Sequence, residues 1–110
     1  GTLSAPVKVS DMSVVTGAVD SEQVGADLIY HEGVLHLLFI EETSRAIYHT
    51  RSSEPGVWQQ PDLVVDNIQG GWVRGTVHQN QEGQPVYGFV YDAGSKGGSG
   101  FNRYMALPLD

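Results

Sequence analysis

Residues 33–40, Gly33-Val34-Leu35-His36-Leu37-Leu38-Phe39-Ile40, form an apolar run that one polar residue interrupts. The run is too short to cross a membrane, which takes about 20 apolar residues. It is shorter than most helices and contains aromatic and β-branched residues. It therefore predicts a strand buried on both faces of a layered all-β structure. A similar run, Pro85-Val86-Tyr87-Gly88-Phe89-Val90-Tyr91, follows further along the chain, and this duplication guides the rest of the interpretation.

The composition limits the size and the partners of the protein. Its 110 residues allow one domain with a core of modest size. Fourteen glycines and only two methionines favour short strands and turns over helices. The net charge of −7 argues against a nucleic-acid partner and an anionic membrane surface, because both bind basic surfaces. The absence of cysteine excludes disulfides and thiolate metal sites. It does not settle the compartment, since many secreted and periplasmic β-proteins also lack cysteine, and a secreted or periplasmic location is the one favoured.

Short segments of β character, separated by turn-forming residues, continue along the whole chain. No window of useful length has a helical period. The glycine- and serine-rich segment 92–100 is expected to be a surface loop. The predicted strands cover residues 5–10, 26–30, 33–40, 45–51, 63–65, 72–78, 85–91 and 101–107.

The chain aligns with itself as two similar units, about 1–58 and 59–110. Four-stranded units at this spacing are typical of β-propeller blades. If the strands of a blade are lettered A to D from the inside outward, their order along the chain is D, A, B, C, D, A, B, C. The aligned segments are Pro6-Val7-Lys8-Val9 with Pro61-Asp62-Leu63-Val64, Asp27-Leu28 with Thr76-Val77, Leu35-His36 with Val86-Tyr87, Glu41 with Asp92, and Tyr48 with Tyr104.

The segment from Leu35 to Trp58 resembles the repeat of sialidase-like β-propellers of the BNR type. Ser53-Glu54-Pro55-Gly56-Val57-Trp58 is similar to the Asp-box of those blades, a turn with the pattern Ser-x-Asp-x-Gly-x-Thr-Trp. It departs from that pattern in having glutamate for aspartate and one residue fewer before the tryptophan. The resemblance implies two propeller blades within one domain and a function connected with carbohydrates.

Two blades do not close a propeller, because rings use roughly four to eight blades. A single chain would also expose apolar blade faces, which soluble monomers rarely tolerate. The strand order leaves the first D strand without a blade and the last blade without a D strand, so one chain's first strand is able to complete another chain's last blade. Head-to-tail contacts of this kind form a ring if the rotation closes. We therefore expect a homo-oligomer, with a six-bladed trimer favoured; the alternative that these residues belong to a longer propeller stays open.

The loops at one face of a propeller usually bind its ligand, and here they carry an indole near charged groups. An indole covers the C–H face of a sugar ring, and charged groups form bidentate hydrogen bonds with its hydroxyls. Packing of Trp72 between blades is an equally good interpretation, and Trp58 is expected to pack in the core. The candidate ligand-binding residues are Trp72, Arg74, Glu41, Glu42 and Asp92.

No catalytic residue, metal site or cofactor is predicted. The four histidines lack metal-ligand spacing, and His36 is expected to be a core residue with a hydrogen-bond partner. Glu41 and Glu42 are adjacent on a turn, where successive side chains point apart, so they do not resemble the carboxylate pair of a glycosidase. The arginines are assigned to strands in different layers, unlike the arginine cluster that sialidase-like hydrolysis implies.

The sequence thus predicts an all-β fold of two four-stranded blades with a carbohydrate-binding, lectin-like function and no catalysis. The expected partners are a glycan and further copies of the chain, and not a nucleic acid or a membrane. Two alternatives stay open. The segment is part of a sialidase-like or polysaccharide-lyase-like enzyme whose other blades hold the catalytic groups, or it is a structural interaction domain.

Overall fold

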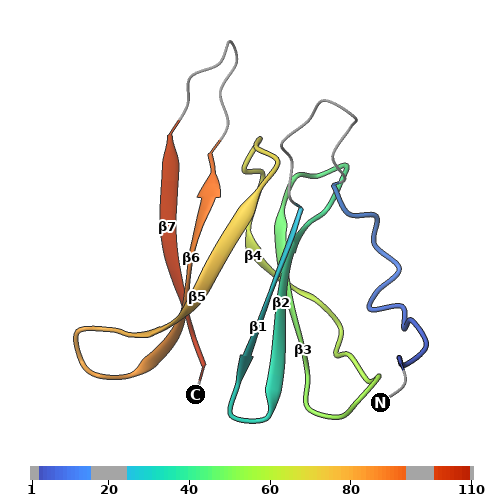
Figure 1. Cartoon of the computed structure of the whole chain (residues 1–110). Helices are drawn as coiled ribbons and strands as arrows, with labels where there is room; N and C mark the ends of the chain where they lie inside the picture. The colour runs from blue at the N-terminus through green and yellow to red at the C-terminus, as the bar shows by residue number, and fades with distance from the viewer. Residues whose placement is uncertain (1–2, 16–24, 94–100, 110) are drawn as a thin grey trace.

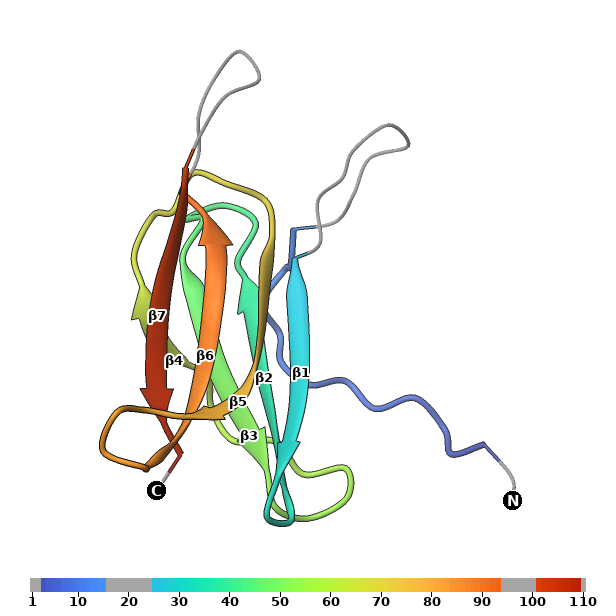
Figure 2. The same cartoon turned by 60° about the vertical axis from the view of Figure 1, so that its left-hand side comes forward.

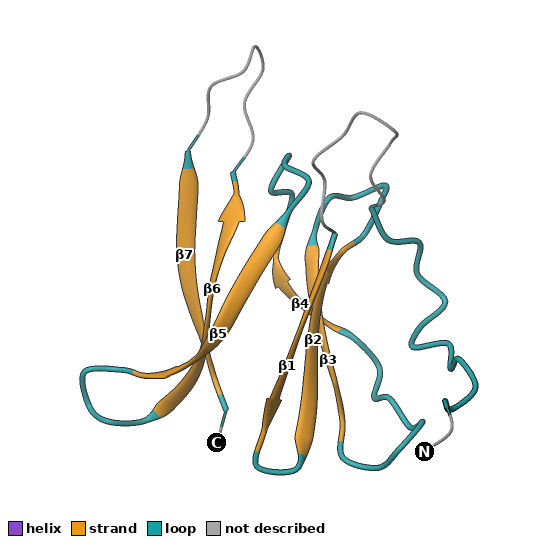
Figure 3. Ribbon diagram, viewed as in Figure 1, coloured by secondary structure: helices purple, strands orange, loops and turns teal. Residues whose placement is uncertain are grey.

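The computed structural model describes residues 3–15, 25–93 and 101–109 of the chain. All regular secondary structure in this part is β, and Figure 3 shows strands joined by loops. Each predicted strand after residue 25 is confirmed to within two residues at either end, while most of the predicted 92–100 loop lies outside the described residues. The strands are β1 (Ala26–His31), β2 (Val34–Ile40), β3 (Ile47–Ser52), β4 (Asp62–Val65), β5 (Val73–Gln79), β6 (Pro85–Asp92) and β7 (Asn102–Pro108).

The strands form two antiparallel sheets in chain order. Sheet 1 contains β1-β2-β3-β4 and sheet 2 contains β5-β6-β7 (Figure 1). The two predicted buried runs, β2 and β6, therefore each lie between two neighbours, as their apolar sequences require. Sheet 2 has three strands among the described residues and not the four of a complete blade, and the predicted strand order had left the last blade without its D strand.

The two sheets pack face to face and have the same orientation. Figure 2 shows β1 and β5 on one side of the molecule, running in the same direction, with β4 and β7 on the other side. The main chains approach most closely where β1 and β2 meet β5, and among the described strands no such approach joins β3 or β4 to β6 or β7. The sheets thus form a wedge that is narrow at β1 and β5.

Large apolar side chains fill this wedge. Leu38 and Ile40 of sheet 1 and Tyr87 and Phe89 of sheet 2 are each at most 1% exposed and belong to one cluster. At the narrow end, the Tyr87 hydroxyl donates hydrogen bonds to the carboxylate and the main-chain oxygen of Asp27. Burial, and then the bond to this carboxylate, raise the pKa of Tyr87 well above its usual range.

The orientation of the sheets corrects the alignment of the two units. Side chains at equivalent places in two sheets of the same orientation must point the same way, yet Leu38 and Phe89, aligned from the sequence, both belong to the one buried cluster shared by the two sheets. The alignment of Leu35-His36 with Val86-Tyr87 is therefore wrong by one residue, and such a slip exchanges the two faces of a strand.

Shifting the alignment of β6 with β2 by one residue makes Leu38 equivalent to Gly88. Glu32-Gly33 then matches Glu82-Gly83, where both glycines have positive φ angles of 84° and 79°. Because Leu38 pairs with Asp27 and Gly88 pairs with Thr76, the alignment of Asp27-Leu28 with Thr76-Val77 stands. The same shift replaces the match between Tyr48 and Tyr104 by one between Tyr48 and Met105.

The predicted strand over residues 5–10 is wrong for the single chain. We call residues 3–12 the N-terminal arm; it has no strand, and residues 3–8 are exposed. After the arm the chain joins sheet 1, where the Val15 N–H donates to the Ile40 carbonyl at 2.9 Å. A segment of alternating sequence becomes a strand only when it exchanges hydrogen bonds with a neighbouring strand, and the arm has no such neighbour among the residues that the structure describes.

Candidate functional site

A cleft of about 490 Å³ lies between the N-terminal arm and the segment that leads into β4. One wall is formed by Lys8 to Met12 and the other by Trp58 to Pro61. Ligand sites for small molecules commonly have volumes of roughly 300–1,000 Å³, so the cleft is large enough for one. We take this cleft as the candidate functional site.

The turn before Trp58 fixes one wall of the cleft. The Val57 N–H donates to the Glu54 carbonyl at 3.0 Å, and Gly56 takes a positive φ of 77° that favours glycine. The Ser52 hydroxyl also donates to the Glu54 carbonyl, at 2.7 Å. The Asp-box-like segment is therefore a tight turn, and it leaves Trp58 half-buried at the cleft rather than in the core, where the sequence had placed it.

Hydrogen bonds to β3 hold the segment after Trp58 in place. The Gln59 N–H donates to the Arg51 carbonyl at 3.0 Å, and the Thr50 hydroxyl donates to the Gln59 carbonyl at 2.6 Å. The Arg51 side chain donates to the Gln59 side-chain oxygen at 3.1 Å. Trp58 is thus followed by a segment fixed at both its main chain and its side chain.

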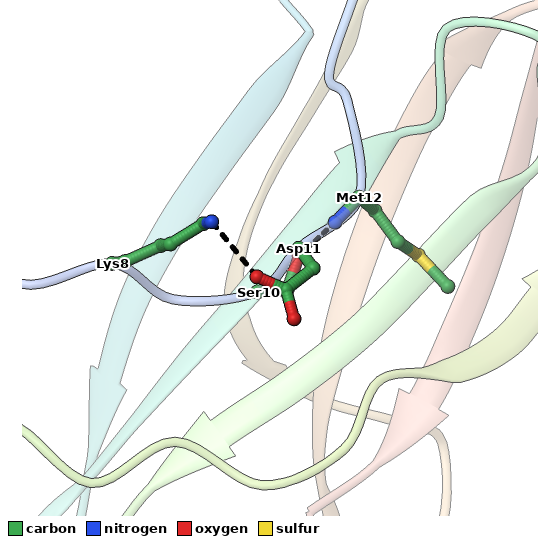
Figure 4. Close-up of polar contacts among 4 residues, drawn as sticks. All are labelled: Lys8, Ser10, Asp11 and Met12. Carbon is green, nitrogen blue, oxygen red and sulfur yellow. Dashed lines mark hydrogen bonds and ion pairs between the residues drawn. The ribbon is translucent and has the colours of Figure 1, made fainter.

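Figure 4 shows the polar contacts of the opposite wall, where Lys8 and Asp11 are exposed. The Lys8 ammonium lies 2.8 Å from the Asp11 carboxylate, and the Met12 N–H donates to the Ser10 hydroxyl at 3.1 Å. The hydrogen bond and charge of Asp11 raise the pKa of Lys8, and Lys8 lowers the pKa of Asp11. Both groups are therefore charged at neutral pH and able to bind hydroxyl groups.

An indole opposite a lysine–carboxylate pair, with amides beside it, is suited to a neutral sugar. The indole provides an apolar face for ring C–H groups, while the ammonium, the carboxylate and the exposed Gln60 amide provide donors and acceptors. The sequence signal for this site was the polar Gln59-Gln60 pair directly after Trp58. The approach of the arm had no sequence signal.

The structure makes neighbours of two of the five residues predicted as a site, Trp72 and Asp92. The Asp92 N–H donates to the Trp72 carbonyl at 3.2 Å, so these two residues are neighbours at the same end of sheet 2. Arg74 is exposed and pairs with Val90 on the face of sheet 2 that points away from sheet 1. Trp72 is half-buried.

The other two predicted site residues lie on sheet 1. The Glu41 carboxylate accepts hydrogen bonds from the N–H groups of Thr43 and Ser44 at 2.8 and 2.9 Å, and these bonds lower the pKa of Glu41. Glu41 thus stabilises the turn after β2, and Glu42 beside it is exposed. Among the described residues, no hydrogen bond or ion pair joins either glutamate to Trp72 or Arg74.

His36 has the hydrogen-bond partner that the sequence predicted for a core histidine. It is 4% exposed, and its Nδ1 lies 3.0 Å from Nε2 of His49, with the two rings stacked. Burial, and then the charge of Arg51, lower the pKa of His36. Burial, and then His36, lower the pKa of His49 to about 4. Nearby, the buried Nε2 of His31 has no hydrogen-bond partner within the described residues.

The folded protein should lose stability as the pH falls from about 6.5 toward 4, because an unfolded histidine, with a pKa of about 6.5, binds a proton more readily than the buried His36 and the half-buried His49 do. Thermal unfolding across this range measures the loss. His49→Gln should flatten the profile relative to the unmodified chain, and His78→Gln, at an exposed histidine, should not. Identical profiles for both variants would contradict this assignment.

The described residues contain neither a cluster of side chains able to hold a metal ion nor a helix able to span a membrane. No group of three or more histidine, aspartate or glutamate side chains there is arranged to hold a metal ion. Within residues 3–15, 25–93 and 101–109, no helix has the length and apolar character to cross a membrane.

Comparison with known proteins gave no relative. No family model, no curated protein and no solved structure matches this chain.

Proposed function

We propose that this protein is a carbohydrate-binding module without catalytic activity, built from two neighbouring β-propeller blades. The observation that carries the function is the cleft of about 490 Å³, which is lined both by Trp58 and by the Lys8–Asp11 pair. The net charge of −7 favours neutral sugars over anionic ones.

The packing of the sheets supports the assignment of propeller blades. Neighbouring blades have the same orientation, and their innermost strands lie closest together. Here β1 and β5 are the close edges and run in the same direction. A sandwich that buried equivalent faces against each other would have placed Gly88, and not Phe89, next to Leu38.

The exposed apolar side chains support assembly into a larger ring. Leu28 and Tyr30 are 55% and 67% exposed on the outer face of sheet 1, and Tyr104 is 56% exposed on the outer face of sheet 2. These outer faces would be covered if sheet 2 of one copy packed on sheet 1 of the next, as the two sheets pack within one chain. A homo-oligomer, with a trimer favoured, is the form we propose.

The turn at Glu41 supports a module without catalysis. A general acid needs a carboxyl that keeps its proton near neutral pH. The two hydrogen bonds that the Glu41 carboxylate accepts from main-chain N–H groups instead favour its ionised form, so this carboxylate stabilises the turn.

The two tryptophans of the chain allow a direct test, because each lies in one candidate site. On an array of immobilised neutral oligosaccharides, Trp58→Ala should weaken binding about tenfold or more. Trp72→Ala, the matched control, should change binding by less than about twofold. Both variants should retain the unfolding transition of the unmodified protein.

Other outcomes have a definite meaning. Loss of binding only in Trp72→Ala would move the site to the residues predicted from the sequence, Trp72, Arg74 and Asp92. An unmodified protein that binds no neutral oligosaccharide on the array would overturn the proposed function.

A further inference from the structure

Sheet 2 is one strand short of sheet 1. In sheet 1, β3 pairs with β4 on its outer side, whereas β7, which takes the place of β3 in sheet 2, pairs with β6 alone among the described residues. Within the described part of the chain, the outer edge of β7 therefore presents main-chain N–H and C=O groups without a partner strand. Such an edge is a template for one more strand.

The N-terminal arm has the sequence of that missing strand. Pro6-Val7-Lys8-Val9 aligns with Pro61-Asp62-Leu63-Val64, which enters and forms most of β4. Its alternation of apolar and polar residues suits a half-exposed strand, and a proline at the start suits an outer strand, where one N–H fewer is needed. In this chain the segment has no main-chain hydrogen bond to either sheet within the described residues.

The arm and the free edge lie on opposite sides of one molecule. Figures 1 and 2 both show the N-terminal arm beyond sheet 1, on the side away from sheet 2, and β7 on the far side of sheet 2. The arm of one chain is thus remote from its own β7. It lies on the side of sheet 1 where sheet 2 of another copy would pack in the head-to-tail arrangement.

We infer that residues 5–10 of one copy add to β7 of a second copy as the fourth strand of its sheet 2. In this contact, main-chain hydrogen bonds between the two copies replace those that each segment otherwise makes with water. The contact also holds sheet 2 of the second copy over the exposed Leu28 and Tyr30 of the first. This inference concerns assembly and does not depend on the sugar site.

Sheet 1 supplies the register of the added strand. His49 pairs with Leu38 and with Asp62. Ala106 takes the place of His49 in sheet 2, because it pairs with Gly88, the equivalent of Leu38. Val7 takes the place of Asp62 in the aligned arm. Val7 of one copy should therefore lie opposite Ala106 of the other, within the range of a disulfide between introduced cysteines.

Cysteine pairing tests this register, since the full chain contains no cysteine of its own. Val7→Cys and Ala106→Cys are prepared separately, mixed and oxidised. Covalent dimer should be the main product. In the control mixture Ala106→Cys is replaced by Thr76→Cys, which is also exposed but lies on β5 at the opposite edge of sheet 2, and only traces of dimer are expected.

Two results would overturn the inference. One is an equal yield of dimer in both mixtures, which indicates random collision. The other is a chain carrying both Val7→Cys and Ala106→Cys that closes the disulfide within itself at high dilution, which places the arm on its own β7. The mass of the unmodified protein by light scattering gives an independent check, and a single-chain mass at every concentration also overturns it. None of these readouts involves a sugar, so failure of glycan binding leaves them unaffected.

Discussion

Phe89→Ala is expected to lower the free energy of unfolding by about 3–5 kcal/mol, the usual range for a buried phenylalanine replaced by alanine. Phe89 is 1% exposed, and its ring contacts those of Tyr87 and Tyr91. Its side chain also lies against the main chain at Gly75, where an added Cβ would come within 2.7 Å of the Phe89 Cβ. The cavity left by the substitution lies between two sheets, and the hydrogen bonds between strands hold the main chain of each sheet in place. The sheets therefore cannot move together to fill the cavity.

Val90→Ala is the matched control for this substitution. Val90 follows Phe89 in β6 but points to the opposite face and is 37% exposed, so its loss should change stability by less than about 1 kcal/mol. Urea denaturation followed by tryptophan fluorescence measures both values. Equal losses in the two variants would show that the face assigned to Phe89 is not the buried one.

Asp27→Ala is expected to lower the free energy of unfolding by about 1–3 kcal/mol, because a buried donor loses its acceptor. The Asp27 carboxylate accepts the Gly75 N–H at 3.1 Å and the Tyr87 hydroxyl. The Tyr87 hydroxyl keeps its second acceptor, the Asp27 main-chain oxygen, in the variant. The Gly75 N–H has no such replacement, and this bond links the two sheets at their closest approach.

A double-mutant cycle separates the role of Asp27 from that of its partner. Tyr87→Phe removes only the hydroxyl, and Asp27→Ala together with Tyr87→Phe should lose less stability than the sum of the two single variants. Strict additivity, measured by urea denaturation, would contradict a shared bond between the sheets.

The strands were predictable from the sequence because their signals are local. Leu38 and Phe89 lie in short apolar runs bounded by turn residues, and such runs are identified without knowledge of the fold. The positive φ of Gly33 and Gly83 likewise follows from a two-unit alignment that includes the turns. The alignment failed by one residue because it matched Glu41 with Asp92 and left the two glycines out.

The candidate cleft was not predictable because it depends on contacts between distant segments. Trp58 was assigned to the core from its position after a turn, and its half-buried state follows from where the arm lies. The same reason explains the partner of His36. His49 lies thirteen residues away, and only the pairing of β2 with β3 brings Nδ1 of His36 to 3.0 Å from Nε2 of His49.

The wedge between the sheets has a consequence for growth of any assembly that repeats this contact. If each added sheet tilts about the same narrow edge at β1 and β5, the stack curves toward that edge and cannot extend in a straight line. Such a stack meets its own beginning after a few units. The exposed outer faces of sheet 1 and sheet 2, which in a flat arrangement would permit a fibre of indefinite length, are then both covered in a closed particle of fixed size.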